Sequence, residues 1–289
     1  MKSHRTVAGL LGALALTLAG ATRAGPFEDG VEAQQHGDYA TALRLWRPLA
    51  QNGGLIPQYN IGLFYAYGLG TPRDLTEAAR WFRKAAEKGY ADAQSNLGAA
   101  YANGWGVSQD YAAAVKWYRA AAGQGNVQAK FNLGALYARG LGVARDDRRA
   151  AELYRIAADA GSADAQANLG LMYAQGLGVP RDDAKAAVWY RKSAEQGNAA
   201  GQFNLGLAYE TGQGVTQDFG QARVWYGKAA DQNLASAHLN LGVIYAKGEG
   251  VPVDLGQARQ HLKMAAGSPT ADDDTRAQAT KALTTLANR

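Results

Sequence analysis

The chain of 289 residues contains no cysteine. This excludes disulfides, thiolate zinc sites and a lipid-modified cysteine near the N-terminus. Histidine is also scarce, and only His36, His238 and His261 occur beyond residue 24. None of them forms an HExxH or other paired-ligand spacing, and no G-x-S-x-G nucleophile motif occurs. The sequence therefore predicts no catalytic residue, no metal site and no cofactor, and packing alone has to stabilise the fold.

Long apolar runs are missing as well, apart from one short run near the N-terminus. A basic start at residues 2–5 precedes a largely apolar run at 7–19, and small residues allow cleavage after Ala21 or Ala24. The run is too short for a hydrocarbon core of about 30 Å. We expect residues 1–24 to be a cleaved signal peptide, with a retained anchor as the alternative. The mature protein is then expected to be periplasmic or secreted, without a transmembrane span.

Charge is modest, since only 19% of residues are charged and the formal net charge is +5. Cleavage after residue 24 would remove Lys2, Arg5 and Arg23, which lowers the net charge to +2. A nucleic-acid-binding domain usually carries a strongly basic face. We therefore expect no nucleic-acid partner.

An internal repeat of 36 residues covers most of the chain. Glycines recur at this interval, and tyrosine, alanine and aspartate series recur with them, as Tyr101, Ala114 and Asp110 do in the second copy. The repeated glycines are Gly62, Gly98, Gly134, Gly170, Gly206 and Gly242. We assign six copies to residues 55–270, an N-terminal cap with a degenerate half-copy to 25–54, and a C-terminal capping helix to 271–289. A period of this length is typical of solenoids.

One period reads as two short helices. Apolar residues at helical spacing predict a first helix (helix A) over 91–103, and the glycine-rich segment that follows breaks it. Asp110 has the position of an N-cap for a second helix (helix B) over 111–122, whose predicted buried face holds Ala114, Trp117 and Ala121. Gly98 lies in the middle of helix A, and we expect it to permit close approach to Ala114. Stacked pairs predict an all-α, right-handed superhelical α-solenoid.

The motifs of the second copy, Asn96-Leu97-Gly98 to Tyr101, Gly104-Trp105-Gly106 and Ala114 to Gly125, resemble the Sel-one-like repeat family, a relative of the tetratricopeptide repeat. The resemblance covers about three quarters of the chain. It implies a superhelical adaptor whose concave helix-A face binds proteins, used in bacteria in envelope assembly, exopolysaccharide control, motility and host interaction. Two copies depart from the pattern: Leu153 replaces a tryptophan, and His261-Leu262 replaces a Trp-Tyr pair, which predicts looser packing there.

By analogy with tetratricopeptide geometry, three helix-A positions should face the groove. They lie three residues before, one after and five after each repeat glycine. Phe131 and Phe203 either line the groove or pack between neighbouring helices, and His238 could face it or be structural. The groove candidates at these positions are Tyr59, Ser95, Phe131, Ala167, Phe203 and Leu239, then Leu63, Ala99, Ala135, Leu171, Leu207 and Val243, then Tyr67, Asn103, Arg139, Gln175, Thr211 and Lys247.

A ladder of asparagines precedes the repeat glycines by two residues. An inward amide can donate and accept, so it could hold the backbone of a bound strand at about 0.5–1.5 kcal/mol per bond. The alternative is a structural bond to the neighbouring helix. The ladder consists of Asn60, Asn96, Asn132, Asn168, Asn204 and Asn240.

A second ladder is basic and follows helix B, with carboxylates four residues beyond three of its members. Such pairs are typical of a solvated helix surface, which we favour over a site for an anionic polymer. The basic ladder consists of Arg83, Arg119, Arg155, Arg191 and Lys263, and Gly227 interrupts it.

Three functional hypotheses follow. We favour a non-enzymatic periplasmic or exported scaffold that binds a protein or peptide in the helix-A groove, in envelope assembly or signalling. The alternative is a module for peptidoglycan or another envelope polysaccharide, with Tyr59, Tyr67 and Phe131 as stacking platforms. The third is a weak envelope hydrolase.

Overall fold

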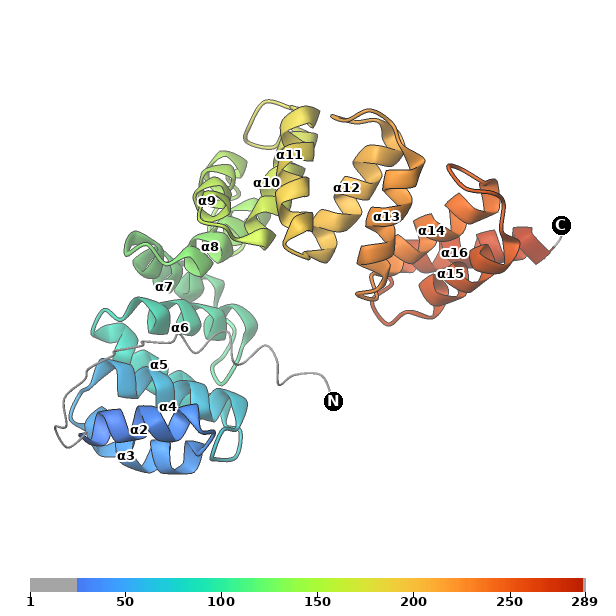
Figure 1. The fold of residues 1–289 in the computed structure, drawn as a ribbon. Coiled ribbons are helices and arrows are strands. Elements are labelled where there is room, and N and C mark those ends of the chain that lie inside the picture. The colour runs from blue at the N-terminus through green and yellow to red at the C-terminus, as the bar shows by residue number, and fades with distance from the viewer. Residues whose placement is uncertain (1–24, 288–289) are drawn as a thin grey trace, which may run out of the picture.

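The computed structural model describes residues 25–287, and the signal-peptide prediction lies outside them. The described part folds into fifteen helices and contains no strand. Consecutive helices pair antiparallel, and each pair stacks on the next, so that the chain traces a curved arc from α2 to α16 (Figure 1). The prediction of an all-α solenoid is confirmed. None of these fifteen helices has the length and apolar character needed to cross a bilayer.

The helices alternate between the two roles predicted for them. The first helix of each copy is α4 (Leu55–Tyr67), α6 (Ala91–Asn103), α8 (Val127–Arg139), α10 (Ala163–Gln175), α12 (Ala199–Thr211) and α14 (Ala235–Lys247). The second is α5 (Leu75–Glu87), α7 (Tyr111–Gly123), α9 (Asp147–Asp159), α11 (Asp183–Glu195), α13 (Phe219–Ala230) and α15 (Leu255–Gly267). The pair α2 (Pro26–Gln35) and α3 (Tyr39–Gln51) precedes them, and α16 (Asp273–Ala287) follows.

Capping residues set the ends of the helices. Asp110 caps the N-terminus of α7 by accepting a hydrogen bond from the Ala113 amide at 2.9 Å, as predicted. Asp146 and Asp182 cap α9 and α11 in the same way. Helix A ends where Gly104 adopts φ +71°, a left-handed conformation that glycine adopts without steric cost. A second glycine, Gly106, lies against the backbone of Leu75 in the preceding repeat, so a Cβ there would clash. The Gly-x-Gly turns are thus contacts between repeats.

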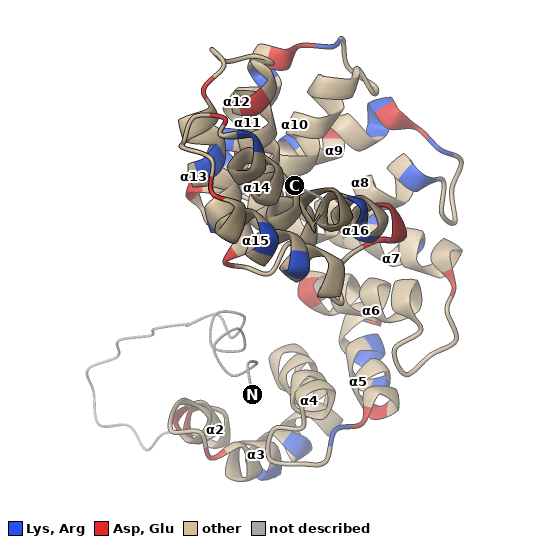
Figure 2. Cartoon of the chain, turned by 90° about the vertical axis from the view of Figure 1, so that its right-hand side faces the viewer, with Lys and Arg blue, Asp and Glu red and all other residues tan. Residues whose placement is uncertain are grey.

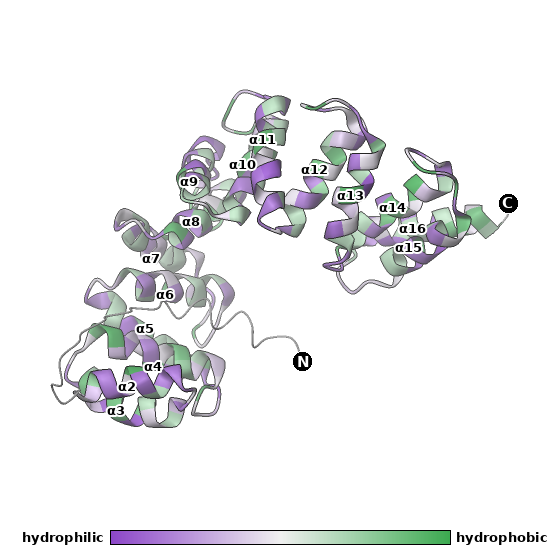
Figure 3. Cartoon of the chain, in the orientation of Figure 1, coloured by the Kyte–Doolittle hydropathy of each residue, from purple (hydrophilic) through white to green (hydrophobic). Residues whose placement is uncertain are grey.

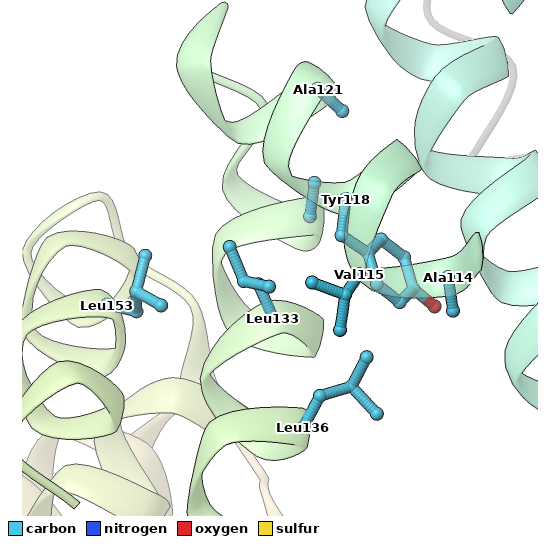
Figure 4. Close-up of a cluster of buried hydrophobic side chains, with 8 residues drawn as sticks. Ala114, Val115, Tyr118, Ala121, Leu133, Leu136 and Leu153 are labelled. Carbon is cyan, nitrogen blue, oxygen red and sulfur yellow. The ribbon is translucent and has the colours of Figure 1, made fainter. Parts of the chain in front are cut away.

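The mid-helix glycine accommodates an aromatic ring. A Cβ on Gly98 would lie 2.7 Å from the Tyr118 ring. In three other copies the carbonyl of the alanine equivalent to Ala114 also lies within 3.4 Å of such a Cβ, which agrees with the expected close approach. Tyr118, rather than Trp117, is the large buried residue of α7, and Trp117 is half-buried. Figure 4 shows Tyr118 from α7 among Ala114, Leu133 and other apolar side chains of α7 and α8. The ring therefore sets the distance between helices A and B.

Polar ladders join successive repeats. The Arg119 guanidinium donates to the Tyr137 hydroxyl at 2.7 Å, and the arginines at 47, 83, 155 and 191 contact the tyrosine 18 residues later in the same way. Among the ion pairs of residues 25–287, none joins this ladder to the carboxylates four residues on. The basic ladder therefore holds repeats together, and its arginines explain the recurrent tyrosines.

The first helix pair shows how a degenerate copy keeps the same contact. Trp46 of α3 is fully buried, and a Cβ on Gly30 of α2 would clash with its ring. Gly30 precedes Trp46 by 16 residues, whereas Gly98 precedes Tyr118 by 20, because the loop between α2 and α3 is shorter. Residues 25–54 thus contain a complete helix pair where the sequence predicts only a half-copy. At the other end, Leu286 of α16 is buried against α15 and Leu283 is half-buried.

The glycine fit generates a stability prediction. Gly170→Ala would place a Cβ 2.7 Å from the Tyr190 ring, and overpacking typically costs about 1–3 kcal/mol, which exceeds a helix-propensity gain of about 1 kcal/mol. We expect a lower free energy of unfolding in urea. The matched control is Gly227→Ala in α13, where nothing lies within 4 Å of the added Cβ, so stability should rise by about 0.5–1 kcal/mol. A gain in both variants would contradict the role of the glycine.

Buried tyrosines predict sensitivity to alkali. Burial raises the pKa of Tyr154 and of Tyr190 to about 12, so their hydroxyls stay protonated in the folded chain at pH values where the unfolded chain ionises. The contribution of each protonated, buried tyrosine to the free energy of unfolding is fully present below about pH 10 and is lost as the pH rises from 10 through 12. The loss is roughly 1 kcal/mol per tyrosine at pH 11. The double variant Tyr154→Phe, Tyr190→Phe should lose less stability between pH 9 and 11 than the wild type. Tyr67→Phe, at an exposed position, should decline as the wild type does.

Candidate binding groove

Helices A line the inner side of the arc. Two pairs of successive helices A, α6 with α8 and α10 with α12, contact each other directly, whereas no two successive helices B of the described part contact each other to the same extent. In a curved stack the elements on the inside are the closer ones, so helices A form the concave surface and helices B the convex one (Figure 1). The exposed residues of helices A are therefore the groove surface.

The positions five residues after each repeat glycine are exposed in all six repeats. Tyr67 is the most prominent of them, with 47% of its surface accessible. One member, Arg139, carries a positive charge near the middle of the groove, and another, Lys247, pairs with Glu249 at 3.4 Å. The exposed set is Tyr67, Asn103, Arg139, Gln175, Thr211 and Lys247.

The positions one residue after the glycine divide into two groups. Leu171 and Leu207 are 37% and 36% exposed, on the adjacent helices α10 and α12. Leu63 is buried, and Ala99, Ala135 and Val243 are half-buried. Because helices α10 and α12 are in contact, Leu171 and Leu207 place two apolar side chains on neighbouring rungs of the groove.

Most side chains at the positions three residues before the glycine are buried or pack against a neighbouring aromatic ring. Ser95, Ala167 and Leu239 are buried, so we correct the expectation that they line an accessible groove. Phe131 and Phe203 are half-buried, and their rings lie 5.7 and 5.5 Å from those of Tyr154 and Tyr226. The structure therefore places these two rings between helices A and B of one repeat, which is the packing alternative.

Tyr59 and His238 are also engaged inside the solenoid. The Tyr59 ring is half-buried and lies 5.2 Å from the Tyr90 ring, and burial raises the pKa of its hydroxyl. His238 is buried and contacts His261 on α15, so it lies outside the accessible groove. Sequence spacing could not show this contact, because the two histidines are on different helices.

The asparagine ladder is half-buried throughout and has structural partners in several repeats. The Asn96 amide donates to the Tyr59 hydroxyl at 3.4 Å, and that of Asn168 donates to the Asp164 carbonyl at 2.8 Å. Asn132 accepts a hydrogen bond from the Gln128 amide at 3.1 Å, and Asn240 is half-buried. Asn60 and Asn204 are half-buried as well. The ladder thus contributes to contacts between helices and repeats.

A ladder of glutamines, which the sequence analysis did not single out, lies on helix A in four of the six repeats, four residues before the repeat glycine. The Gln94 amide donates to the Ala86 carbonyl at 3.1 Å, and Gln166 and Gln202 bond to carbonyls eight residues before them. Gln58 does the same in the first repeat. The recurrence of Gln at 36-residue spacing was the available signal. These bonds fix each helix A against the preceding helix B.

Charge is dispersed over the surface. Lys and Arg alternate with Asp and Glu along the chain, and neither sign forms a continuous stripe in the view of Figure 2. Apolar residues recur at intervals along every helix (Figure 3). Among residues 25–287, no three His, Cys, Asp or Glu side chains are placed to hold a metal ion. The concave surface thus carries exposed apolar side chains among polar ones.

A family model described as Sel1 repeat matches six consecutive segments of the chain. They are residues 58–90, 91–126, 127–162, 163–198, 199–234 and 235–267. The chain is a Sel1 repeat protein. The predicted family is thereby confirmed, and Sel1 repeats are in general non-catalytic scaffolds that mediate protein interactions.

Solved structures agree with the assignment. A Sel1 repeat protein from Oxalobacter formigenes is 34% identical, with a TM-score of 0.78 over 84% of this chain and 97% of that one. The protein c5321, a protective antigen of uropathogenic Escherichia coli with an SLR fold, is also 34% identical, with a TM-score of 0.75. That match covers 91% of this chain but only 60% of c5321. No curated protein matches the chain.

The groove residues should be replaceable without loss of fold. Leu171→Gln and Leu207→Gln keep helix propensity and remove exposed apolar surface, so each should change the free energy of unfolding by no more than about 0.5 kcal/mol. Leu169→Ala and Leu205→Ala, at fully buried positions two residues earlier, should cost about 2–5 kcal/mol. Urea unfolding followed by circular dichroism measures both. Equal losses would show that Leu171 and Leu207 belong to the core.

Proposed function

We propose that this Sel1 repeat protein is a non-enzymatic scaffold that binds an extended protein segment along its concave helix-A surface. The observation that supports it is the pair Leu171 and Leu207, which are exposed on adjacent helices although neighbouring leucines, such as Leu169 and Leu205, are fully buried. Exposed apolar anchors surrounded by polar residues are typical of peptide-binding surfaces. More than a third of the surface of each of these two side chains remains accessible on the concave side.

The chemistry of the groove favours a protein over a glycan. Stacking on a sugar needs accessible rings, and of the three platforms considered only Tyr67 is exposed, since Tyr59 and Phe131 are half-buried against other aromatic residues. The polar edge, with Asn103, Gln175 and Thr211, can bond to the backbone of an extended segment. An envelope polysaccharide is thus the second candidate.

The proposed place of action is outside the cytoplasm, in envelope assembly or signalling. Two features support it: the signal-peptide pattern of residues 1–24 and the lack of cysteine, which leaves no thiol to oxidise in that compartment.

Site-specific crosslinking in the native envelope tests the groove. A photoreactive residue at Gln175 or Thr211, both exposed on helix A, should capture a defined partner, and one at Glu152 on the convex side should not. The triple variant Tyr67→Gln, Leu171→Gln, Leu207→Gln should lose the capture. The matched control, Ile156→Gln, Val188→Gln, Val224→Gln, removes three comparably exposed apolar residues from helices B and should retain it.

Binding of the purified partner then decides the outcome. We expect the groove variant to bind at least tenfold more weakly than the wild type, while the convex variant binds equally. Equal loss in both variants, or recovery of glycan fragments in place of a protein, would contradict the proposal. Circular dichroism must show that both variants are folded.

A further inference from the structure

Three departures from the repeat pattern converge on one place between α13, α14 and α15. His238 stands where Gln occurs in four other repeats, and His261 stands where Trp occurs in four. Gly227 stands where the preceding helices B and α3 carry the arginine that contacts the next tyrosine. The equivalent residues are Gln58, Gln94, Gln166 and Gln202, then Trp81, Trp117, Trp189 and Trp225, then Arg47, Arg83, Arg119, Arg155 and Arg191. Contacts within the solenoid account for the usual residues at these positions, but not for their replacement by His238, His261 and Gly227.

The two imidazoles face each other through their Nδ1 atoms. His238 Nδ1 and His261 Nδ1 are 3.0 Å apart, and the ring centroids are 5.3 Å apart. Because a ring nitrogen lies on the perimeter of its ring, these two distances place both nitrogens between the centroids, close to the line that joins them. Tyr245, which lacks an arginine partner at position 227, stacks on His261 with an angle of 7° between the rings. The pair is therefore held in a head-on orientation.

The contact of His238 also differs from the one that the other repeats make at this position. The glutamines there donate to the carbonyl eight residues earlier, on the preceding helix B. His238 instead directs its Nδ1 at His261 of α15. The histidine therefore joins helices A and B of the same repeat through two ring nitrogens.

A pocket of about 420 Å³ opens beside the pair and gives it access to solvent. Met264 lies on its wall, one helical turn beyond His261 on α15, and 44% of its surface is exposed. Asp231 and Arg223 line it too.

We propose that His238 and His261, with the thioether of Met264, bind one copper(I) ion in this pocket. Two head-on imidazole nitrogens suit the linear coordination that this ion accepts, and a thioether selects it over harder ions. At a metal–nitrogen distance of about 2 Å, the two nitrogens need to separate by about 1 Å more. His261 is half-buried, and a change in its side-chain torsions supplies such a movement. A monovalent ion also limits repulsion from Arg223.

Copper(I) titration of the purified full-length chain tests the proposal, under anaerobic, reducing conditions with bicinchoninate as the competing chelator. The chain has no cysteine, so no thiol site interferes. We expect one ion per wild-type chain. His238→Gln and His261→Trp each restore the residue of the other repeats, so they should fold, and each should weaken binding at least tenfold. Met264→Leu should weaken it by a smaller factor, and His36→Gln should have no effect.

X-ray absorption of the copper-loaded protein gives the ligands directly. Two nitrogens and one sulfur support the proposal. It would be overturned if the wild type took up no more copper than His238→Gln, if both histidine variants bound as the wild type does, or if the spectrum showed no sulfur. It would also be overturned if zinc alone bound as tightly as copper(I), because the site would then not be selective for a soft ion. Circular dichroism of each variant verifies that it is folded.

Discussion

The contact on which the whole solenoid depends is that of a bare helix backbone with an aromatic ring. The glycine in the middle of helix A has no side chain, and the helix-B ring 20 residues later occupies the space, as Tyr190 does against Gly170. This contact sets the distance and the angle between the two helices of a repeat. Five of the six copies keep the ring, and in the last copy Leu262 fills the same space. Glycine weakens an isolated helix, so this geometry is stable only because the ring fills the vacant volume.

Contacts between repeats add polar groups at fixed sequence offsets to the apolar packing of neighbouring helices. Arginine reaches a tyrosine 18 residues ahead, glutamine reaches a carbonyl eight residues back, and the second glycine of each turn touches the preceding repeat. Side chains that take part in none of these contacts are free to vary. On helices A these are the exposed positions that include Tyr67, Leu171 and Leu207. Scaffold and binding surface thus occupy separate positions of the same helix.

The sequence predicts the fold well because its period is strict and each helix end carries a capping residue. The helix predicted over 91–103 is observed with those bounds, and Asp110 caps the next helix as expected. The groove was predicted less well, because an analogy with tetratricopeptide repeats gives the face of a helix but not the depth of each side chain. Ser95 and Leu239, which the analogy places in the groove, are buried. The rings of Phe131 and Phe203 contact tyrosine rings on helix B of the same repeat. The contact of His238 with His261 depends on stacking of separate helices, which no local pattern encodes.

The second glycine of each turn has a consequence for how such a protein can change in size. The atoms nearest to it belong to the repeat before it, as Tyr111 does for Gly142 and Asp147 for Gly178. This glycine contact is therefore the same at every junction and involves neighbouring repeats. A duplicated stretch of one period, inserted anywhere in the interior, would meet the same junction on both sides. Gene duplication could lengthen or shorten the concave surface in whole steps, and the length of the partner segment that it holds could evolve without any redesign of the core.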